Sequence, residues 1–402
     1  MYLTGEFPSY IDALFETISG FTTTGSSILS DVETLSRGTA FWRCFTHWIG
    51  GMGVLVFIMA VMPLSDSSSM HLMRAESPGP AVGKLVPKVK TTAMILYGIY
   101  VVFTVIEIIA LLIAGMPLFD SMTLTFGTVG TGGFGLLNSS IASYSTAVQI
   151  IITVFMIICS INFTVYYMFL IKRPKEALMC EEMRYYLLIV FGSALLIAFN
   201  IRASFASFGK AFQQAIFQVA SVISTTGFAT ADFNLWPEFS RMILVLLMFV
   251  GACAGSTGGG FKVSRLIIMV KSVRNEIMSV THPRSVQKVH MDGRRIPDNV
   301  VKTVLCYLAG YVVILIVSVL LISLDNFDMT TNFTAVMATF NNVGPGLNRV
   351  GPTGNFGGFS VLSKLVLMFD MLVGRLELYP MLVIFAPGLW RIHPHRHVGK
   401  VQ

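Results

Sequence analysis

Charged residues are scarce in this sequence. Asp, Glu, Lys and Arg make up only 12% of its 402 residues, whereas 54% are hydrophobic and the mean hydropathy is +0.72. Soluble domains carry roughly 25% charged residues, so the composition excludes a soluble globular fold. Several apolar runs of about twenty residues have the length that crosses a bilayer. The composition therefore predicts an all-α polytopic membrane protein.

Paired cysteines and catalytic clusters are also missing. The five cysteines stand singly, in or beside apolar runs, so we interpret them as small buried hydrophobic residues. They are Cys44, Cys159, Cys180, Cys253 and Cys306. The sequence shows no nucleophile with its base, no carboxylate pair and no His/Cys metal cluster. We therefore expect neither enzyme activity nor a cofactor in this chain.

Lys and Arg are nearly absent from one group of loops and crowd another. Segment 133–144 contains neither residue, whereas 65–90, 172–175 and 271–295 are basic, and the net charge is +7. Such an excess is typical of cytoplasmic loops in membrane proteins. We therefore expect no nucleic-acid partner, and we place the basic loops and the C-terminus in the cytoplasm.

A short polar segment centred on glycine occurs four times. The copies are Ser19-Gly-Phe-Thr-Thr-Thr-Gly25, Thr128-Val-Gly-Thr-Gly132, Ile223-Ser-Thr-Thr-Gly227 and Phe340-Asn-Asn-Val-Gly344. Each follows an amphipathic run and precedes a long apolar one, which indicates internal repeats. The predicted unit is span, pore helix, polar loop and span, with the leading span missing from the first copy. The predicted units are residues 1–90, 91–183, 184–298 and 299–402.

Four such loops suit the coordination of a cation. Non-helical backbone at membrane depth is tolerated only where protein or a watery cavity surrounds it. A ring of backbone carbonyls can replace the hydration shell of a monovalent cation, and glycine leaves no Cβ in the way. We therefore predict a selectivity filter. Its residues are Thr23, Thr24, Gly25, Thr131, Gly132, Thr226, Gly227, Val343 and Gly344, and all except Thr23 are predicted cation ligands.

Glycines crowd residues 251–260, in the middle of an apolar run. Each costs a helix roughly 1 kcal/mol relative to alanine, so we predict a break in the span. Close helix packing through small residues is the alternative. A phosphate-binding loop is not supported, because Phe261 precedes Lys262 and Val263 follows it.

Arg375 lies within another apolar run, with Asp370 and Glu377 nearby. Charges inside a membrane face a cavity or a partner. Two interpretations stay open, a charge that faces the ion path and a structural ion pair with one of these carboxylates. We interpret His47 as a packing or interfacial residue, and we assign Glu107 no role beyond a buried hydrogen bond.

Seven segments, in order along almost the whole chain, resemble the Trk/Ktr/HKT superfamily of cation transporters. The resemblance is closest to the bacterial Trk-type potassium uptake subunits. The segments are Asp12-Ala-Leu-Phe-Glu16 with the first polar loop, His47-Trp-Ile-Gly-Gly-Met-Gly53, Arg74-Ala-Glu-Ser-Pro-Gly-Pro80, the glycine-rich run 251–260, His282-Pro-Arg284, Asn341-Asn-Val-Gly-Pro-Gly346 and Gly374-Arg-Leu-Glu377.

The resemblance implies K⁺ uptake across the bacterial cytoplasmic membrane through a gated, channel-like pore. It implies a homodimer in the lipid membrane that assembles with a cytosolic, nucleotide-binding ring. It also implies an intramembrane gate. The gating residues would be Gly255, Ser256, Thr257, Gly258, Gly259, Gly260 and Arg375. Family members have helices before the first pore helix that this sequence lacks, so we expect a chain extended upstream to be more stable and more active.

The alternative function is a Na⁺- or H⁺-coupled secondary transporter with a midplane site in broken helices. That class predicts inverted or paired repeats with acidic residues near the break. The four repeats here run in parallel, and their polar loops contain no carboxylate.

Overall fold

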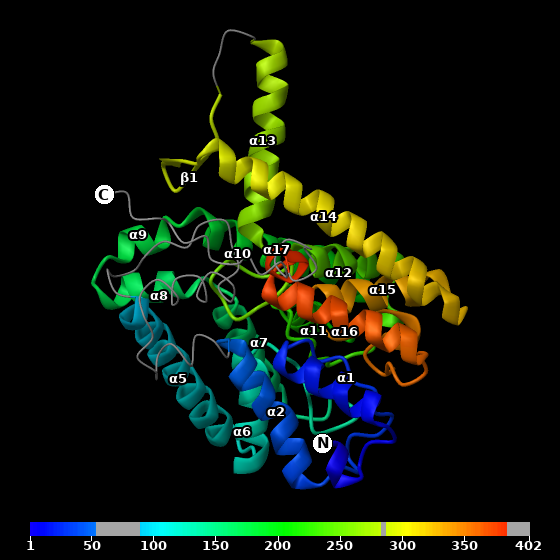
Figure 1. Cartoon of the computed structure of the whole chain (residues 1–402). Coiled ribbons are helices and arrows are strands. Elements are labelled where there is room, and N and C mark those ends of the chain that lie inside the picture. The colour runs from blue at the N-terminus through cyan, green and yellow to red at the C-terminus, as the bar shows by residue number, and fades with distance from the viewer. Residues whose placement is uncertain (54–88, 283–286, 384–402) are drawn as a thin grey trace, which may run out of the picture.

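The computed structural model describes residues 1–53, 89–282 and 287–383 (Figure 1). These residues are mostly helical, with a single two-stranded hairpin in which β1 (His290–Met291) pairs antiparallel with β2 (Arg294–Arg295). The motif at residues 74–80, most of the basic loop 65–90, the second half of the predicted span 41–64 and the C-terminal tail lie outside the described residues, as does Arg284.

A short helix precedes each polar loop, as the sequence predicted. These helices are α1 (Tyr10–Phe21), α6 (Leu118–Val129), α11 (Phe208–Ile223) and α15 (Met329–Phe340). Three of them begin at a side-chain cap, because Ser9, Ser207 and Asp328 each accept a hydrogen bond from a backbone N–H of the first turn. Helix α6 follows Pro117 instead.

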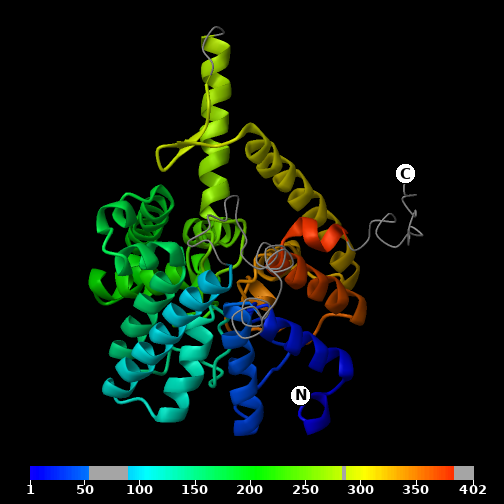
Figure 2. The same cartoon turned by 60° about the vertical axis from the view of Figure 1, so that its left-hand side comes forward.

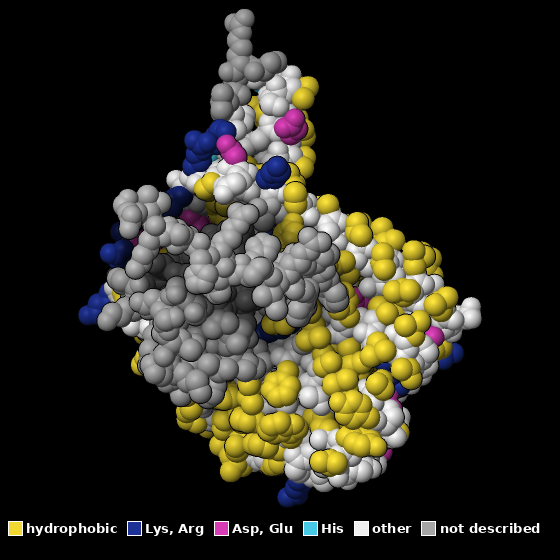
Figure 3. Space-filling model, viewed as in Figure 1, with side chains coloured by type: hydrophobic (Ala, Val, Ile, Leu, Met, Phe, Trp, Pro, Cys, Tyr) yellow, Lys and Arg dark blue, Asp and Glu magenta, His cyan; other side chains and the backbone are white. Residues whose placement is uncertain are grey.

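Three helices of the described chain are long and apolar enough to cross a membrane. They are α5 (Val89–Ile113), α10 (Glu181–Ile201) and α14 (Asp298–Ile322). Most of their apolar side chains are not covered by protein, and Ile106 and Ile109 of α5 are each 50% exposed. Figure 3 shows hydrophobic side chains spread over the surface around α14 and α16. A helix that is apolar all round and still exposed suits a lipid environment.

The spans that follow the second, third and fourth polar loops are each interrupted. They are α7 (Thr146–Cys159) with α8 (Phe163–Leu170), α12 (Glu238–Val250) with α13 (Val263–Thr281), and α16 (Val361–Leu376) with α17 (Leu378–Val383). After the first polar loop, the described residues contain α2 (Arg37–Gly51). Helices α7 and α8 meet at 88°, and the pair counts as a fourth candidate span if it is taken as one.

The predicted break at residues 251–260 is present, since 251–262 are not helical. The apolar runs 144–171 and 361–385, which the sequence indicates as one span each, are also broken within the described residues. Asn162 stops the first of these, because its side chain caps the new helix α8. The second stops at Glu377, whose φ of 72° lies outside the helical region.

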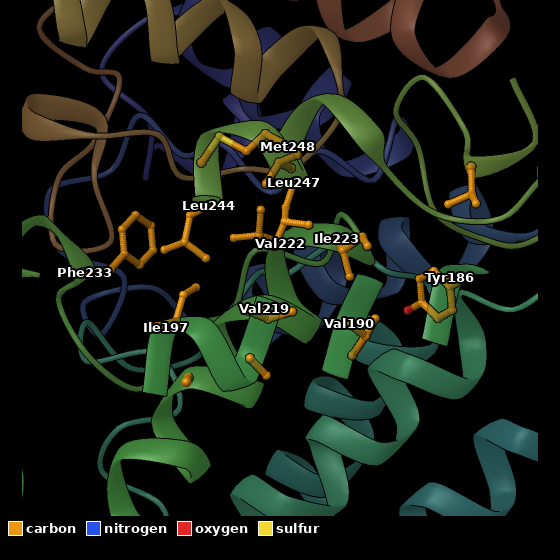
Figure 4. Close-up of a cluster of buried hydrophobic side chains, with 14 of the residues drawn as sticks. Tyr186, Val190, Ile197, Val219, Val222, Ile223, Phe233, Leu244, Leu247 and Met248 are labelled. Atoms are coloured by element: carbon orange, nitrogen blue, oxygen red, sulfur yellow. The ribbon is translucent and has the colours of Figure 1, made fainter. Parts of the chain in front are cut away.

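The largest core cluster joins α10, α11 and α12 with the short turn η3 (Phe233–Leu235). Figure 4 shows Val190, Val222 and Leu244 pointing into it from the three helices. The cluster extends to Ile223 and Val343, which border the third and fourth polar loops. Burial of these side chains therefore holds two of the polar loops against the helices that precede them.

Helix α13 projects well beyond the packed body, with the β1–β2 hairpin beside it (Figures 1 and 2). Lys271 of α13 pairs with Glu181 at 2.5 Å and donates to the His290 carbonyl at 2.7 Å, which fixes the hairpin to α10 and α13. The remaining short elements are η1 (Tyr2–Thr4), α9 (Pro174–Leu178), η2 (Arg202–Ser204), η4 (Ser323–Asp325) and η5 (Asn348–Val350).

A buried ion pair joins α1 to α2. Arg43 Nη2 and Nε lie 2.6 and 2.9 Å from Glu16 Oε1, and neither side chain is more than 2% exposed. The other Glu16 oxygen accepts the backbone N–H of Ile28, and the Arg43 guanidinium lies 4.1 Å from the centre of the Phe134 ring. The pair thus connects the first pore helix to the chain that follows the first polar loop and, through Phe134, to the second polar loop.

We predict that Arg43→Ala lowers the free energy of unfolding by about 3–5 kcal/mol, because it leaves the Glu16 carboxylate buried without its cation. Arg173→Ala is the control, since its pair with Glu176 has side chains 62% and 58% exposed, and we expect a loss below about 1 kcal/mol. Denaturant unfolding in detergent measures both. Equal losses would contradict the importance of the buried pair.

Candidate functional site

The four polar loops share one backbone conformation. In each, a residue with positive φ is followed two positions later by a glycine with positive φ. The first residues are Thr23 (53°), Thr131 (53°), Thr225 (60°) and Asn342 (54°), and the glycines are Gly25 (77°), Gly133 (80°), Gly227 (87°) and Gly344 (101°). Positive φ is uncommon for residues with a Cβ, so its recurrence at equivalent positions marks a shared geometry.

A shared hydrogen bond turns each loop back on its helix. The residue between the two positive-φ positions donates its N–H to the carbonyl five residues earlier. The pairs are Thr24 to Ser19 (2.9 Å), Gly132 to Gly127 (2.8 Å), Thr226 to Ser221 (2.9 Å) and Val343 to Ala338 (2.8 Å). Each bond satisfies a carbonyl at the end of the preceding helix, so the loop leaves that helix in the same direction every time.

The loops close into a ring. A Cβ added to Gly25 would strike the Gly132 carbonyl oxygen, one on Gly133 the Thr226 oxygen, and one on Gly227 the Val343 oxygen. The fourth glycine returns to the first loop, since a Cβ on Gly344 would lie 2.8 Å from the Thr24 oxygen. Backbone therefore packs directly against backbone all the way round, which only glycine permits.

The ring corrects the predicted register of the second loop. The sequence predicts Gly132 as the equivalent of Gly25, Gly227 and Gly344, but the residue in that position is Gly133. Gly132 instead matches Thr24, and Thr131 matches Thr23. The missed signal was the phenylalanine that follows both Gly133 and Gly227.

Side-chain oxygens occur at the first positive-φ position of each loop. Thr225 Oγ1 accepts the N–H of Gly259 at 2.7 Å, and Thr131 Oγ1 donates to the Gly130 carbonyl at 2.7 Å. Thr23 Oγ1 and Asn342 Oδ1 are buried and find no hydrogen-bond partner within the described chain. Thr225 and Asn342 are not among the filter residues predicted from the sequence.

The glycine-rich loop lies directly against the third and fourth polar loops. A Cβ on Gly259 would come within 3.0 Å of Asn342 Oδ1, and one on Gly258 within 2.8 Å of the Ser224 carbonyl. Thr257 Oγ1 donates to the Cys159 carbonyl at 3.1 Å, which ties the loop to the break between α7 and α8. The predicted gating residues 255–260 are thus packed under the ring.

Arg375 connects three parts of the chain. Its Nη1 donates to the Thr257 carbonyl at 2.7 Å, and its Nη2 donates to the Gly51 carbonyl at 2.8 Å and to that of Gly50. The two carboxylates considered as its partners are engaged elsewhere. Glu377 pairs with Arg265 at 2.6 Å, and Asp370 accepts from Ser318 at 2.8 Å. The guanidinium therefore holds the glycine-rich loop and the end of α2 together.

Two further buried charges anchor the glycine-rich loop, and the sequence analysis missed both roles. Glu182 Oε1 accepts the N–H groups of Ala254 at 2.7 Å and Ser264 at 3.1 Å. Lys262, which is 1% exposed, donates to the Gly258 carbonyl. Lys262 entered the sequence analysis only as a departure from a phosphate loop, although a lysine inside an apolar run signals a buried partner.

Hydrogen bonds also join the segments that follow the first and second polar loops. Asn138 donates to Asp31 at 2.8 Å, and its backbone N–H donates to Glu33 at 2.9 Å. The Asn138 amide, together with the Glu33 backbone N–H, keeps the pKa of the Asp31 carboxyl below its ordinary value. These contacts connect the segments that follow the first and second polar loops.

The chain resembles known transport proteins over nearly its full length. The family model TrkH, described as a cation transport protein, matches residues 2–392. The Trk system potassium uptake protein TrkH of Salmonella typhimurium is 36% identical over 388 residues, which cover 94% of this chain and 79% of that protein. TrkG of Escherichia coli K12, also a Trk system potassium uptake protein, is 32% identical over 95% of this chain and 79% of its own length.

A solved structure has the same fold. The crystal structure of the potassium transporter TrkH from Vibrio parahaemolyticus superposes with a TM-score of 0.85 at 33% identity, and the match covers 95% of this chain and 80% of that one.

We predict that Gly133→Ala is far more destabilising than Gly115→Ala. Both glycines have positive φ, 80° and 85°, so both variants incur backbone strain of about 1–2 kcal/mol. A Cβ on Gly115 meets nothing within 4 Å, whereas one on Gly133 strikes the Thr226 carbonyl and adds about 1–3 kcal/mol of overpacking. Thermal unfolding of the two purified variants measures the difference. Equal shifts in Tm would show that the second loop does not contact the third.

Proposed function

Because this chain belongs to the TrkH family of cation transport proteins, we propose that it carries K⁺ into a bacterial cell across the cytoplasmic membrane. Relatives at 36% and 32% identity are potassium uptake proteins. The observation that carries the proposal is the closed ring of four polar loops. We assign the chain no enzymatic reaction and no cofactor.

In this proposal the ring is the selectivity filter of one pore, and the carbonyls of the four loops replace the water around K⁺. The units 1–90, 91–183, 184–298 and 299–402 each contribute one loop. With the corrected register, the ligands are the backbone groups of Thr24, Gly25, Gly132, Gly133, Thr226, Gly227, Val343 and Gly344. The buried oxygens of Thr23 and Asn342 support a further ligand position at the cytoplasmic end of the ring.

The glycine-rich loop and Arg375 form the gate in this proposal. The loop packs against Thr225 and Asn342, at the end of the ring, and Arg375 holds it there through Thr257. A fixed guanidinium about 4 Å from a passing cation opposes it by about 4 kcal/mol at an effective dielectric constant near 20. That barrier slows passage roughly a thousandfold. Uptake therefore requires the loop to move aside, which its glycines permit.

The basic loops support the proposed orientation, with the C-terminus in the cytoplasm and the ring opening outward. Helix α13 and the hairpin beside it project from the side of the molecule that carries the glycine-rich loop (Figure 1). We propose that this side faces a cytosolic, nucleotide-binding ring and that the membrane subunit is a homodimer.

One observation favours the alternative of coupled transport. Glu107 is fully buried in α5, and neither of its carboxylate oxygens has a hydrogen-bond partner in the described ranges. A carboxyl of this kind can carry a proton. If H⁺ moves with K⁺, a K⁺ gradient imposed on reconstituted vesicles will drive a pH change that Glu107→Gln abolishes, whereas a simple pore produces no coupled H⁺ flux.

We predict that the chain restores growth of a potassium-uptake-deficient bacterium at low K⁺ and that Gly133→Ser abolishes this rescue or weakens K⁺ preference over Na⁺. The reason is that a side chain enters a ring built of bare backbone. Gly115→Ser is the matched control: it carries similar backbone strain but no clash, and it should restore growth with the wild-type K⁺ preference. Unchanged K⁺/Na⁺ discrimination after substitution of Gly25, Gly133, Gly227 and Gly344 in turn would refute the filter assignment.

We predict that Arg375→Ala raises K⁺ flux into reconstituted vesicles, up to the thousandfold limit set by the charge, and reduces dependence on a cytosolic partner. Arg375→Lys keeps the charge and should keep flux low. Thermal stability is measured on the same preparations. If flux falls in step with stability, Arg375 is a structural link and not part of the gate.

A further inference from the structure

The four polar loops differ in what fills the space inside each turn. In the first loop the hydroxyls of Thr22 and Thr24 lie 2.8 Å apart, and in the third those of Ser224 and Thr226 lie 2.7 Å apart. In the fourth, Asn341 donates to the Tyr311 hydroxyl at 2.8 Å. The equivalent residues of the second loop are Gly130 and Gly132, so that loop has no side chain of its own at either position.

His47 of α2 occupies the empty space. A Cβ added to Gly132 would run into the imidazole, and one added to Gly130 would lie 2.5 Å from the His47 carbonyl oxygen. Unlike Gly133, Gly132 does not have a positive φ, so its φ does not call for glycine. The imidazole, and not the backbone, therefore requires glycine at position 132.

The imidazole also bridges two loops through hydrogen bonds. His47 is fully buried, its Nδ1 lies 2.8 Å from the Gly20 carbonyl oxygen, and its Nε2 lies 3.3 Å from the Phe134 backbone N. A carbonyl can only accept and an N–H can only donate, so Nδ1 carries the proton and Nε2 the lone pair. The ring is neutral and held in one tautomer between the first pore helix and the second polar loop.

The bond from Phe134 controls the direction of a filter carbonyl. The Phe134 N–H belongs to the same peptide group as the Gly133 C=O. The two bonds of a trans peptide point in opposite directions, so an N–H directed at His47 turns the Gly133 carbonyl away from it. The imidazole thereby fixes the orientation of this carbonyl in the ring.

We propose that His47 is a positioning residue for ion selectivity, which holds the Gly133 carbonyl in place of the side chains that the second loop lacks. The proposal rests on the proposed function, because selectivity has meaning only if the ring passes cations. It replaces the interpretation of His47 as a packing or interfacial residue.

A double-mutant cycle tests the contact. His47→Ala removes the ring and both hydrogen bonds, and Gly132→Thr adds a side chain where the ring lies. We expect each single variant to lower K⁺/Na⁺ selectivity about tenfold, the scale of one lost buried hydrogen bond. In the double variant the threonine enters the vacated space, as in the first and third loops. We therefore expect it to recover most of the selectivity and of the Tm lost in Gly132→Thr.

A conservative series separates positioning from packing. His47→Gln keeps one N–H donor and one acceptor, whereas His47→Leu only fills space. We expect the glutamine variant to retain selectivity within about threefold of wild type and the leucine variant to lose about tenfold even where its Tm is near normal. Leu and Gln variants with equal selectivity would overturn the proposal. The proposal would also be overturned if Gly132→Thr lowered selectivity equally in the wild-type background and in the His47→Ala background.

The stability cycle is measured on purified protein and needs no transport. Coupling in Tm between positions 47 and 132 supports the contact, and purely additive shifts overturn it. A wild-type chain that takes up no K⁺ overturns the proposed function, while the coupling in Tm still decides the contact between His47 and the second loop.

Discussion

Backbone N–H and C=O groups that are removed from water need partners, and this constraint governs the centre of the molecule. Each polar loop leaves its helix through one N–H that bonds to the carbonyl five residues back. Its next residue lies against the carbonyl of the neighbouring loop, so the position must be glycine. In the neighbouring glycine-rich loop, Arg375 and Lys262 donate to the Thr257 and Gly258 carbonyls, and the Gly259 N–H bonds to the Thr225 hydroxyl of the third polar loop. Much of the buried charge in this part of the chain serves to satisfy backbone groups.

The elements that the sequence predicted correctly depend on local chemistry. Three kinds of signal determine the structure of their own segment. They are helix caps such as Ser9 and Asp328, apolar runs of membrane length, and the helix-breaking glycines of 251–260. Two of the errors had a local signal, namely the phenylalanine after Gly133 and the helix cap Asn162. The others concern distant contacts. The Phe134 N–H bonds to His47, 87 residues away, and the acceptors of Arg375 lie 118 and 324 residues from it in sequence. Periodicity and composition contain no information about such pairs, so the ring order and the anchors of the glycine-rich loop required the structure.

The glycine-rich loop combines freedom at one end with restraint at the other. Two hydrogen bonds hold its first part. The Ala254 N–H donates to Glu182, and Thr257 Oγ1 donates to the Cys159 carbonyl at the break between α7 and α8. Its later glycines touch the ring. Of the hydrogen bonds described above, one joins these glycines to a polar loop, from the Gly259 N–H to the Thr225 hydroxyl. A movement that frees the ring can therefore be confined to residues 258–260 once the bond from Lys262 to the Gly258 carbonyl is released, since backbone at Gly258 and Gly259 rotates without a Cβ to carry past Ser224 or Asn342.

The order in which the ring closes has a consequence for biosynthesis. Ser26 and the Gly344 carbonyl, which join the first loop to the fourth, are separated by 318 residues. A ribosome synthesises the first three loops well before the last one, and contacts of such long sequence separation form late. A half-made chain in the membrane therefore has an open arc in place of a ring. The contact between Ser26 and Gly344 can therefore form only after the final unit has been inserted beside the first.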